Sequence, residues 1–352
     1  MSYQDYFRKV TPYVPGEQPK EDDIVKLNTN ENPYPPSPKV ASALKNVGGA
    51  QSRKYPDPTA ALLRDALAER YGVRSSQVFV GVGSDDVLGM CFLTFFNSER
   101  PILFPEVTYS FYPVWAELFR IPYRTVALRE GFRIVPEDYL TENGGVVIAN
   151  PNAPTGIALS VSEIETIVAG NPDSVVIVDE AYVDFGAVSC QCLLNKYPNL
   201  AVVQTFSKSR SMAGMRIGYC IAGEPLIAAL QNVKYSYNSY TMNEASILAG
   251  KAALEDEAYF VECCKRIAET REWARQEFEK LSFVCTDSKA NFLFVSHRSV
   301  PAKRIFEALR ERKIFVRYFA QPHIDNYLRV TIGTRAEMER LFSALRGILA
   351  EA

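Results

Sequence analysis

The chain has 352 residues, of which 47% are hydrophobic and 23% charged, and its net charge is −2. This composition is typical of a globular protein with a large core and argues against a disordered chain. Because acidic and basic residues balance, the sequence has no electrostatic footprint for nucleic acid or for an anionic membrane. We therefore expect small-molecule partners.

The numbers of cysteines and histidines limit the disulfide and metal sites that the chain could form. The seven cysteines and two histidines make neither a disulfide framework nor a histidine-rich metal site, so we expect no metal. Residues 1–5 lack an apolar signal core, and the most apolar run, residues 78–96, is broken by Asp85 and Asp86. We expect a soluble, cytoplasmic protein that takes its difficult chemistry from an organic cofactor.

The first forty residues are rich in proline and asparagine, which disfavours a regular helix. We predict an N-terminal arm over residues 1–40, a large domain over 41–270 and a small domain over 271–352. Apolar residues recur at helical spacing from residue 60 to 71, and Gly72 ends this predicted helix.

A strand, a glycine turn and a helix start are predicted next, over residues 77–86, with Ser84 or Asp85 as the helix N-cap. Free backbone amides at such a turn suit a phosphate. Asp86 stands where the dinucleotide-binding fingerprint has its third glycine, so that fingerprint is absent. A second helix is predicted to open at residues 108–112.

Short apolar runs then alternate with helical segments as far as residue 222. The runs lack polar alternation, as expected of strands covered by helices on both faces; they are residues 102–104, 146–149, 175–178 and 200–203. This pattern predicts an α/β fold with a large, doubly wound, mainly parallel sheet.

The remainder of the chain predicts a smaller α+β domain in the C-terminal part. A long helix through residues 271–281 leads to it. Its expected strands and helix are residues 291–295, 305–309 (the helix), 314–316 and 328–332.

A lysine, Lys208, lies just beyond the strand at residues 200–203, with hydroxyl side chains on both sides and Arg216 eight residues further on. Ligands of open α/β sheets bind at this edge, and hydroxyl and guanidinium groups hold phosphate. By position alone, a solvated surface lysine is the commoner interpretation.

Three segments in order favour a catalytic lysine: residues 151–156 (Pro-Asn-Ala-Pro-Thr-Gly), 179–182 (Asp-Glu-Ala-Tyr) and 205–218 around Lys208. Together they resemble the pyridoxal-phosphate enzymes of the aspartate aminotransferase fold, fold type I, and within them the histidinol-phosphate aminotransferase family. The resemblance runs from Tyr13 to Thr334. It implies a class II aminotransferase with pyridoxal 5'-phosphate as its cofactor.

The resemblance also implies roles at the cofactor. Lys208 would bond to the cofactor aldehyde, with its pKa lowered from about 10.4 by desolvation and nearby cations. Asp179 would keep the ring nitrogen protonated, and Tyr182 would donate to the phenolic oxygen. Tyr109 would stack on the ring. The phosphate would be held by Ser84, the backbone amide of Asp85, Thr205, Ser207, Arg216 and, from a partner subunit, Tyr55.

One position departs from the family pattern. The family usually has Asn-Asn-Pro-Thr-Gly, and the residue before the proline binds the phenolic oxygen; here that residue is Ala153. Either Asn152 turns inward to replace it, or Tyr182 acts with less help. We expect Asn152 to do so.

Substrate-binding residues are implied at both ends of the chain. Arg329 matches an arginine that grips the substrate carboxylate as a fork, and Arg317 matches one that meets the substrate phosphate. Tyr13 matches a tyrosine that reaches the same phosphate across the dimer interface. Asn30 belongs to the arm that covers the site and is also expected to bind substrate.

The implied reaction is the transamination of L-histidinol phosphate with 2-oxoglutarate to imidazole acetol phosphate and glutamate, EC 2.6.1.9, in histidine biosynthesis. A homodimer with shared active sites would carry it out. An aminotransferase for aromatic amino acids and a phosphothreonine decarboxylase remain open on the same fold. A regulatory module that binds pyridoxal phosphate is disfavoured, since no DNA-binding domain or basic face is present.

Overall fold

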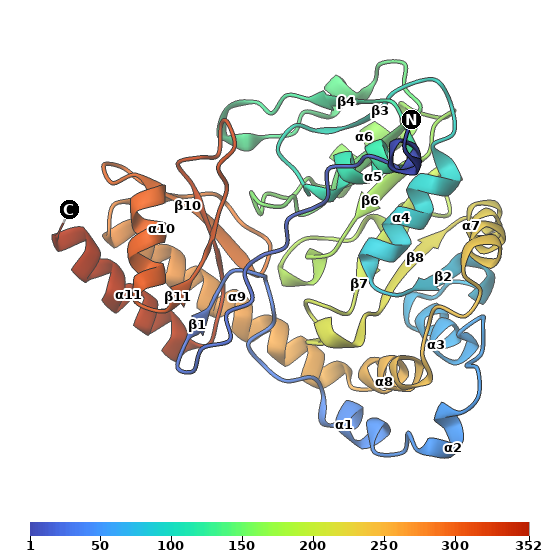
Figure 1. Ribbon diagram of the computed structural model, residues 1–352, viewed down its shortest axis with the longest axis horizontal. Helices are drawn as coiled ribbons and strands as arrows, with labels where there is room; N and C mark the ends of the chain where they lie inside the picture. Colours follow the sequence, from blue (N-terminus) through green and yellow to red (C-terminus); the bar gives the residue numbers. More distant parts are fainter. Residues whose placement is uncertain (352) are drawn as a thin grey trace.

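The computed structural model describes residues 1–351, and within them the larger sheet has seven strands in the order β2-β8-β7-β6-β5-β3-β4 (Figure 1). The strands are β2 (Val78–Gly81), β3 (Ile102–Pro105), β4 (Tyr123–Val126), β5 (Gly145–Ala149), β6 (Val176–Asp179), β7 (Leu200–Thr205) and β8 (Gly218–Ala222). The predicted α/β class with a mainly parallel sheet is confirmed.

One strand, β8, runs antiparallel to both of its neighbours, β2 and β7. The pairs β3–β4, β3–β5, β5–β6 and β6–β7 are parallel. Parallel neighbours need a crossover, whereas an antiparallel pair needs only a short connection. The loop from β7 to β8 contains one turn of 3₁₀ helix, Ala213–Met215, so the chain returns beside β7 in the opposite direction.

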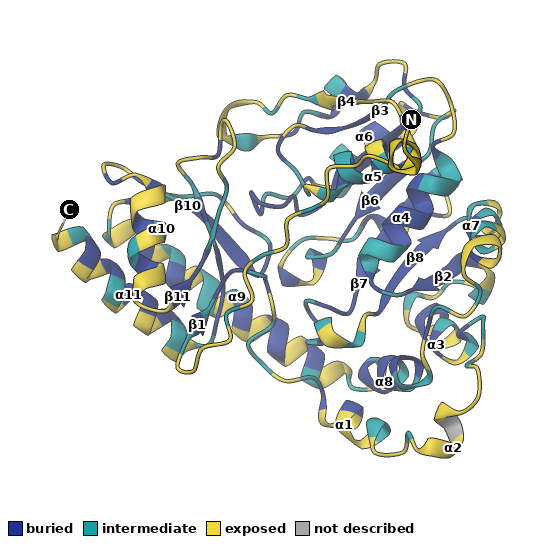
Figure 2. Ribbon diagram, in the orientation of Figure 1, coloured by how far each residue is buried: buried dark blue, intermediate teal, exposed yellow. Residues whose placement is uncertain are grey.

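Helices cover both faces of this sheet. Along β6, Val176 and Val178 pack into one apolar cluster with α3, α6 and α8, whereas Ile177 packs into another with α4, α5 and α7. Figure 2 shows the strands as a buried layer between the helices. The helices are α1 (Pro38–Leu44), α2 (Gly49–Ser52), α3 (Ala61–Tyr71), α4 (Ser84–Phe95), α5 (Phe111–Phe119), α6 (Val161–Ala169), α7 (Glu224–Tyr237), α8 (Glu244–Leu254), α9 (Glu257–Lys280), α10 (Ala302–Glu311) and α11 (Arg335–Ala350).

A second unit contains α9, α10 and α11 and an antiparallel sheet in the order β12-β13-β10-β9. Its strands are β9 (Phe283–Cys285), β10 (Phe292–His297), β12 (Arg317–Tyr318) and β13 (Leu328–Thr331). From the arm, β1 (Val25–Lys26) pairs in parallel with β11 (Ile314–Phe315). The core of this unit includes Leu27 and, from the first half of α9, Ile267. Leu27 of the predicted arm and Ile267 of the predicted large domain thus pack in the core of the second unit. The expected domain divisions at residues 40 and 271 stay predictions.

One helix start differs from expectation. The helix α4 begins at Ser84 with Gly83 as its N-cap, one or two residues before the predicted N-cap, because the chain turns at Gly83 with φ +88°. The helix α5 begins at Phe111, within the predicted range, so Tyr109 lies in the loop before it. By contrast, α3 ends as predicted, with Gly72 at φ +64°. Within residues 1–351, no helix is both long and apolar enough to span a membrane.

Candidate active site

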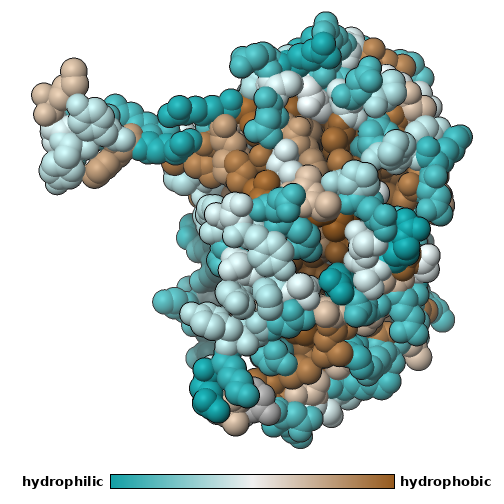
Figure 3. Space-filling model, turned by 90° about the vertical axis from the view of Figure 1, so that its right-hand side faces the viewer, coloured by the Kyte–Doolittle hydropathy of each residue, from teal (hydrophilic) through white to brown (hydrophobic). Residues whose placement is uncertain are grey.

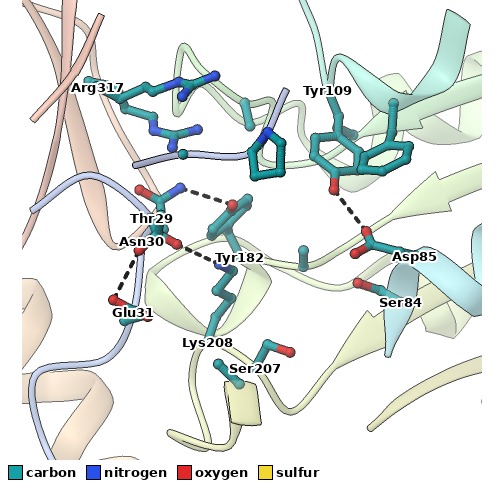
Figure 4. Close-up of a pocket in the computed structure, with 18 of the residues that line it drawn as sticks. Thr29, Asn30, Glu31, Ser84, Asp85, Tyr109, Tyr182, Ser207, Lys208 and Arg317 are labelled. Atoms are coloured by element: carbon teal, nitrogen blue, oxygen red, sulfur yellow. Dashed lines mark hydrogen bonds between the residues drawn. The ribbon is translucent and has the colours of Figure 1, made fainter. Parts of the chain in front are cut away.

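A cavity of about 490 Å³ opens at the carboxyl ends of β5, β6 and β7, between the larger sheet, the arm and the second unit (Figure 4). Open α/β sheets bind their ligands at this edge. Most of the predicted site residues line it: Tyr13, Asn30, Ser84, Asp85, Tyr109, Asp179, Tyr182, Ser207, Lys208, Arg216, Arg317 and Arg329.

Two predicted phosphate ligands lie outside this lining. The Thr205 hydroxyl lies 3.0 Å from the Ser207 hydroxyl and donates to the Ile217 carbonyl at 3.2 Å. Tyr55 is 81% exposed and lies against Tyr240 with the two rings tilted by 33° and their centroids 4.7 Å apart. In its own chain, Tyr55 is therefore away from the cavity.

Asn152 does not turn into the cavity as expected. Its amide donates to the Val107 carbonyl at 2.9 Å, and its side-chain oxygen accepts the Thr108 hydroxyl at 2.7 Å. These partners bind the side chain to the loop before α5, and the neighbouring Ala153 lines the cavity instead. The other alternative, in which Tyr182 acts with less help, fits this arrangement.

Lys208 reaches the cavity from the loop that follows β7. Its Nζ donates to the Thr29 carbonyl at 3.0 Å. The Asn32 amide donates to the backbone carbonyl of Lys208 at 3.0 Å, so the arm holds both ends of this residue. The dashed lines in Figure 4 show the contact with Thr29.

The Lys208 amine has a lowered pKa. Burial is the largest cause, and the positive charges of Arg329 and Arg216 act in the same direction, whereas Asp85 and Glu31 oppose them. The resulting pKa is about 8. Near neutral pH, a fraction of the amine is therefore free to act as a nucleophile or base.

Asp179 lines the cavity from the carboxyl end of β6. The side chain is buried, its Oδ2 accepts the Tyr112 hydroxyl at 2.9 Å, and its Oδ1 accepts the Ala181 amide at 3.2 Å. Burial raises its pKa to about 6 despite these two donors. A carboxylate in this environment suits a cationic N–H partner such as the protonated ring nitrogen of pyridoxal phosphate.

The next acid, Glu180, points away from the cavity. It accepts the Ser189 hydroxyl at 2.6 Å, the Cys190 amide at 2.7 Å and the Gln204 amide at 2.7 Å. Its role is structural. Among residues 1–351, no group of three or more histidine, cysteine, aspartate or glutamate side chains is placed to hold a metal.

A glycine turn forms an anion cradle beside Arg216. A Cβ on Gly83 would lie 2.4 Å from Nη2 of Arg216, and a Cβ on Gly218 would lie 2.3 Å from the Ser84 nitrogen. Both glycines thus permit the close approach of β8, Arg216 and the start of α4. A helix N-terminus beside a guanidinium fits the phosphate of the cofactor.

Asp85 uses its side chain as well as its position at the start of α4. Its Oδ1 accepts the Tyr109 hydroxyl at 2.8 Å (Figure 4). Its Oδ2 lies 3.6 Å from Nη2 of Arg216. The sequence indicated only a role for the backbone amide. The carboxylate also fixes the tyrosine that is expected to stack on the cofactor ring.

Asn30 connects the arm to Tyr182. Its amide donates to the Tyr182 hydroxyl at 3.0 Å, and its side-chain oxygen accepts the Thr331 hydroxyl at 3.0 Å. The Asn291 amide donates to the backbone carbonyl of Asn30 at 3.0 Å. These bonds make Asn30 a positioning group for Tyr182, in addition to the substrate contact expected of it.

Two arginines form the opposite wall. Arg317 and Arg329 are register partners on β12 and β13, so their guanidinium groups lie on neighbouring strands. Nη2 of Arg329 donates to the Asn28 carbonyl at 3.0 Å, while its buried Nε has no hydrogen-bond partner within residues 1–351. Burial lowers the Arg329 pKa, and the charge of Arg317 lowers it further. A bound anion would offset both effects.

Tyr13 lies on the arm at the cavity wall and stacks on Phe111, with ring centroids 4.3 Å apart.

Sequence reasoning missed three residues of this site. Thr29 contributes a backbone carbonyl, for which no sequence signal exists. Asn32 and Tyr112 carried signals typical of a loop asparagine and of a core aromatic residue.

The class I and II aminotransferase family model matches residues 22–345. The chain is 51% identical over 342 residues to the histidinol-phosphate aminotransferase of Acinetobacter baylyi, covering 96% of this chain and 95% of the relative. It is 49% identical over 342 residues to the histidinol-phosphate aminotransferase of Clostridium botulinum, with 97% of each chain covered.

A solved structure has the same fold. The histidinol-phosphate aminotransferase of Sinorhizobium meliloti in complex with pyridoxal-5'-phosphate superposes with a TM-score of 0.86, over 93% of this chain and 91% of that one. The sequence identity is 23%, so this likeness speaks for the fold alone.

Proposed function

The chain belongs to the class I and II aminotransferases, and we propose that it transfers the amino group of L-histidinol phosphate to 2-oxoglutarate with pyridoxal 5'-phosphate as cofactor. The observation that carries the proposal is one cavity that joins Lys208, Asp179 and the two arginines of β12 and β13. An amine, a buried carboxylate and paired guanidinium groups are the functional groups that this reaction needs.

The residues divide the work at the cofactor. When bound, pyridoxal phosphate supplies an electron sink for the substrate carbon that loses a proton. Asp179 would bind the ring nitrogen and keep it protonated, and Tyr182 would donate to the phenolic oxygen. The amides at the start of α4 and the guanidinium of Arg216 would bind the phosphate. Lys208 would take the proton from the substrate carbon, which its pKa of about 8 permits.

The two arginines accept the anionic ends of both substrates. L-Histidinol phosphate offers a phosphate and 2-oxoglutarate offers carboxylates, and each is recognised by a planar guanidinium fork. The buried Nε of Arg329 is a donor available for such an anion. The same wall therefore serves two chemically different substrates in turn.

The test compares amino donors on the purified protein loaded with pyridoxal phosphate. L-Histidinol phosphate, phenylalanine and O-phosphothreonine are each supplied with and without 2-oxoglutarate, and glutamate and carbon dioxide are measured. We expect glutamate mainly from L-histidinol phosphate, with ping-pong kinetics. Glutamate mainly from phenylalanine, or carbon dioxide from phosphothreonine, would replace the proposal with the corresponding enzyme.

The proposal includes a homodimer in which Tyr55 of one subunit binds the cofactor phosphate of the other. Its 81% exposure is consistent with a role outside its own cavity. Exposed tyrosines also occur along and after α7, at positions 235, 237 and 240. Figure 3 shows brown, apolar patches along the middle of the face that carries α7.

Mixed dimers test the shared site. The variants Tyr55→Ala and Lys208→Ala are purified separately, then unfolded and refolded together. In a mixed dimer, one cavity contains the intact Lys208 and receives the intact Tyr55 from the partner, so activity should return. No recovery from a mixture that forms dimers by light scattering would contradict the shared site.

A further inference from the structure

Tyr112 of α5 has a buried hydroxyl that the mechanism above leaves without a role. Its side chain is fully buried among aromatic rings, with centroids 6.1 Å from Phe92, 5.8 Å from Phe104 and 6.3 Å from Trp115. In this apolar setting the hydroxyl donates to Oδ2 of Asp179 at 2.9 Å. Burying a hydroxyl without a hydrogen bond costs folding free energy, and the bond to Asp179 avoids that cost for Tyr112.

Asp179 lies among groups that disfavour its charge. Burial raises its pKa to about 6, and the carboxylates of Asp85 and Glu180 act in the same direction. The donors that oppose them are the Tyr112 hydroxyl and the Ala181 amide. Other titratable or charged groups that line the cavity near this strand end are Tyr109 before α5, Tyr182 after β6, Lys208 after β7 and Arg216 before β8.

We propose that Tyr112 is a positioning residue that keeps the Asp179 carboxylate ionised and oriented toward the ring nitrogen of bound pyridoxal phosphate. The inference rests on the proposed function, because it concerns how the same cavity holds that cofactor. Two donors from different elements fix the carboxylate: the hydroxyl from α5 on Oδ2, and the Ala181 amide on Oδ1 at 3.2 Å. Without the hydroxyl, burial would favour the neutral acid, which binds a protonated ring nitrogen poorly.

A second buried tyrosine, Tyr139, offers a matched control. Its side chain is 1% exposed, and its hydroxyl has no hydrogen-bond partner within the described residues. Replacing either tyrosine with phenylalanine keeps the ring and removes one buried hydroxyl. Only Tyr112→Phe removes a donor from Asp179.

The experiment measures affinity and not turnover. Apoproteins of the wild type, Tyr112→Phe and Tyr139→Phe are titrated with pyridoxamine 5'-phosphate between pH 5.5 and 9 by calorimetry. This ligand has the ring nitrogen and the phosphate but no aldehyde for Lys208. Loss of a hydrogen bond to a charged group should raise the proton affinity of Asp179 about tenfold.

The sign of the expected change follows from the protonation state. Asp179 must be ionised to bind the protonated nitrogen, so a higher pKa moves the loss of affinity to higher pH. We expect Tyr112→Phe to bind about fivefold more weakly than the wild type at pH 6, with the ratio falling toward one at pH 9. Tyr139→Phe should follow the wild-type profile throughout.

A ligand without the ring nitrogen separates tuning from packing. A pyridoxamine phosphate analogue with carbon in place of that nitrogen should bind the wild type and Tyr112→Phe alike. A ratio that is independent of pH, an equal shift in Tyr139→Phe, or a difference with the carbon analogue would overturn the inference. Failure of the wild type to bind pyridoxamine phosphate would instead overturn the proposed function, and this inference with it.

Discussion

The two walls of the cavity are built in different ways. At the strand ends of the larger sheet, Asp179 has a donor on each oxygen, and the turn at Gly83 packs so closely that a Cβ on Gly218 would collide with it. On the wall made by β12 and β13, the Nε of Arg329 has no hydrogen-bond partner among residues 1–351, and Arg317 donates to the Val14 carbonyl of the arm at 3.4 Å. The first wall is preorganised for a resident group. The second wall keeps hydrogen-bond donors available for substrates that bind and are released in each reaction cycle.

The largest effect should come from the preorganised wall. Lys208→Ala removes the amine that accepts the substrate proton, and we expect kcat to fall by about 10³-fold or more. Glutamate formation from L-histidinol phosphate measures it. The control is Lys196→Ala, an exposed lysine paired with Glu165, which should retain full activity. Retained turnover in Lys208→Ala would place the base elsewhere in the cavity.

Substitutions in the wall made by β12 and β13 should mainly change the affinity for substrates. Arg329→Lys keeps the positive charge but loses the planar fork, and a lost hydrogen bond to a charged group costs about 1.5–3 kcal/mol. We expect KM for both substrates to rise about 10- to 100-fold, while the Kd of the cofactor stays nearly constant. The exposed Arg335, which pairs with Glu339, gives the matched Arg→Lys control. A change confined to the cofactor Kd would erase the distinction between the walls.

Gly218→Ala tests how tightly the cofactor wall is packed. The added methyl would lie 2.3 Å from backbone atoms of Gly83 and Ser84, and overpacking of this kind costs about 1–3 kcal/mol. We expect a lower Tm and about tenfold weaker binding of the cofactor phosphate. Gly347→Ala, on α11 with no atom of residues 1–351 within 4 Å of the new methyl beyond its own helix backbone and chain neighbours, is the control and should not lower Tm. Normal binding by Gly218→Ala would mean that the turn adapts.

The smallest predicted effect concerns the electrostatic coupling between Arg329 on one wall and Lys208 on the other. In the apoprotein, the reactivity of Lys208 toward an amine-modifying reagent should rise with pH and reach half its maximum near pH 8. Arg329→Gln removes a positive charge that lowers the Lys208 pKa, so the midpoint should move to higher pH and reactivity at pH 8 should fall about threefold. Mass spectrometry of the Lys208 peptide gives the profile. A midpoint that stays fixed or moves lower would contradict the coupling.

The fold class could be predicted from the sequence because hydrophobic periodicity is set by residues that are close together in the chain. Runs such as residues 146–149 and 175–178 have the composition of strands covered on both sides, and alternation with helices implies a parallel sheet. The reversed direction of β8 was not readable. It depends on the route of the loop from β7, and apolar runs do not encode strand direction.

The sequence allowed candidate site residues to be proposed where they lie at or shortly after a strand end, as Asp179 and Lys208 do, and their roles stay predictions. Asn152 was misjudged because its partners, Val107 and Thr108, are 44 or more residues away in the sequence. Thr29 acts through a carbonyl that every residue type possesses. These assignments required the tertiary contacts.

The sequence by itself determined the class of fold, the family resemblance and the set of polar residues available at the strand ends, since these follow from spacing and residue type. Only the tertiary structure decided which of those residues share the cavity, that Asn30 serves Tyr182, and that Tyr112 bonds to Asp179. The physical reason is that burial and hydrogen-bond partners fix the charge and direction of a side chain, and both are set by segments distant in the chain.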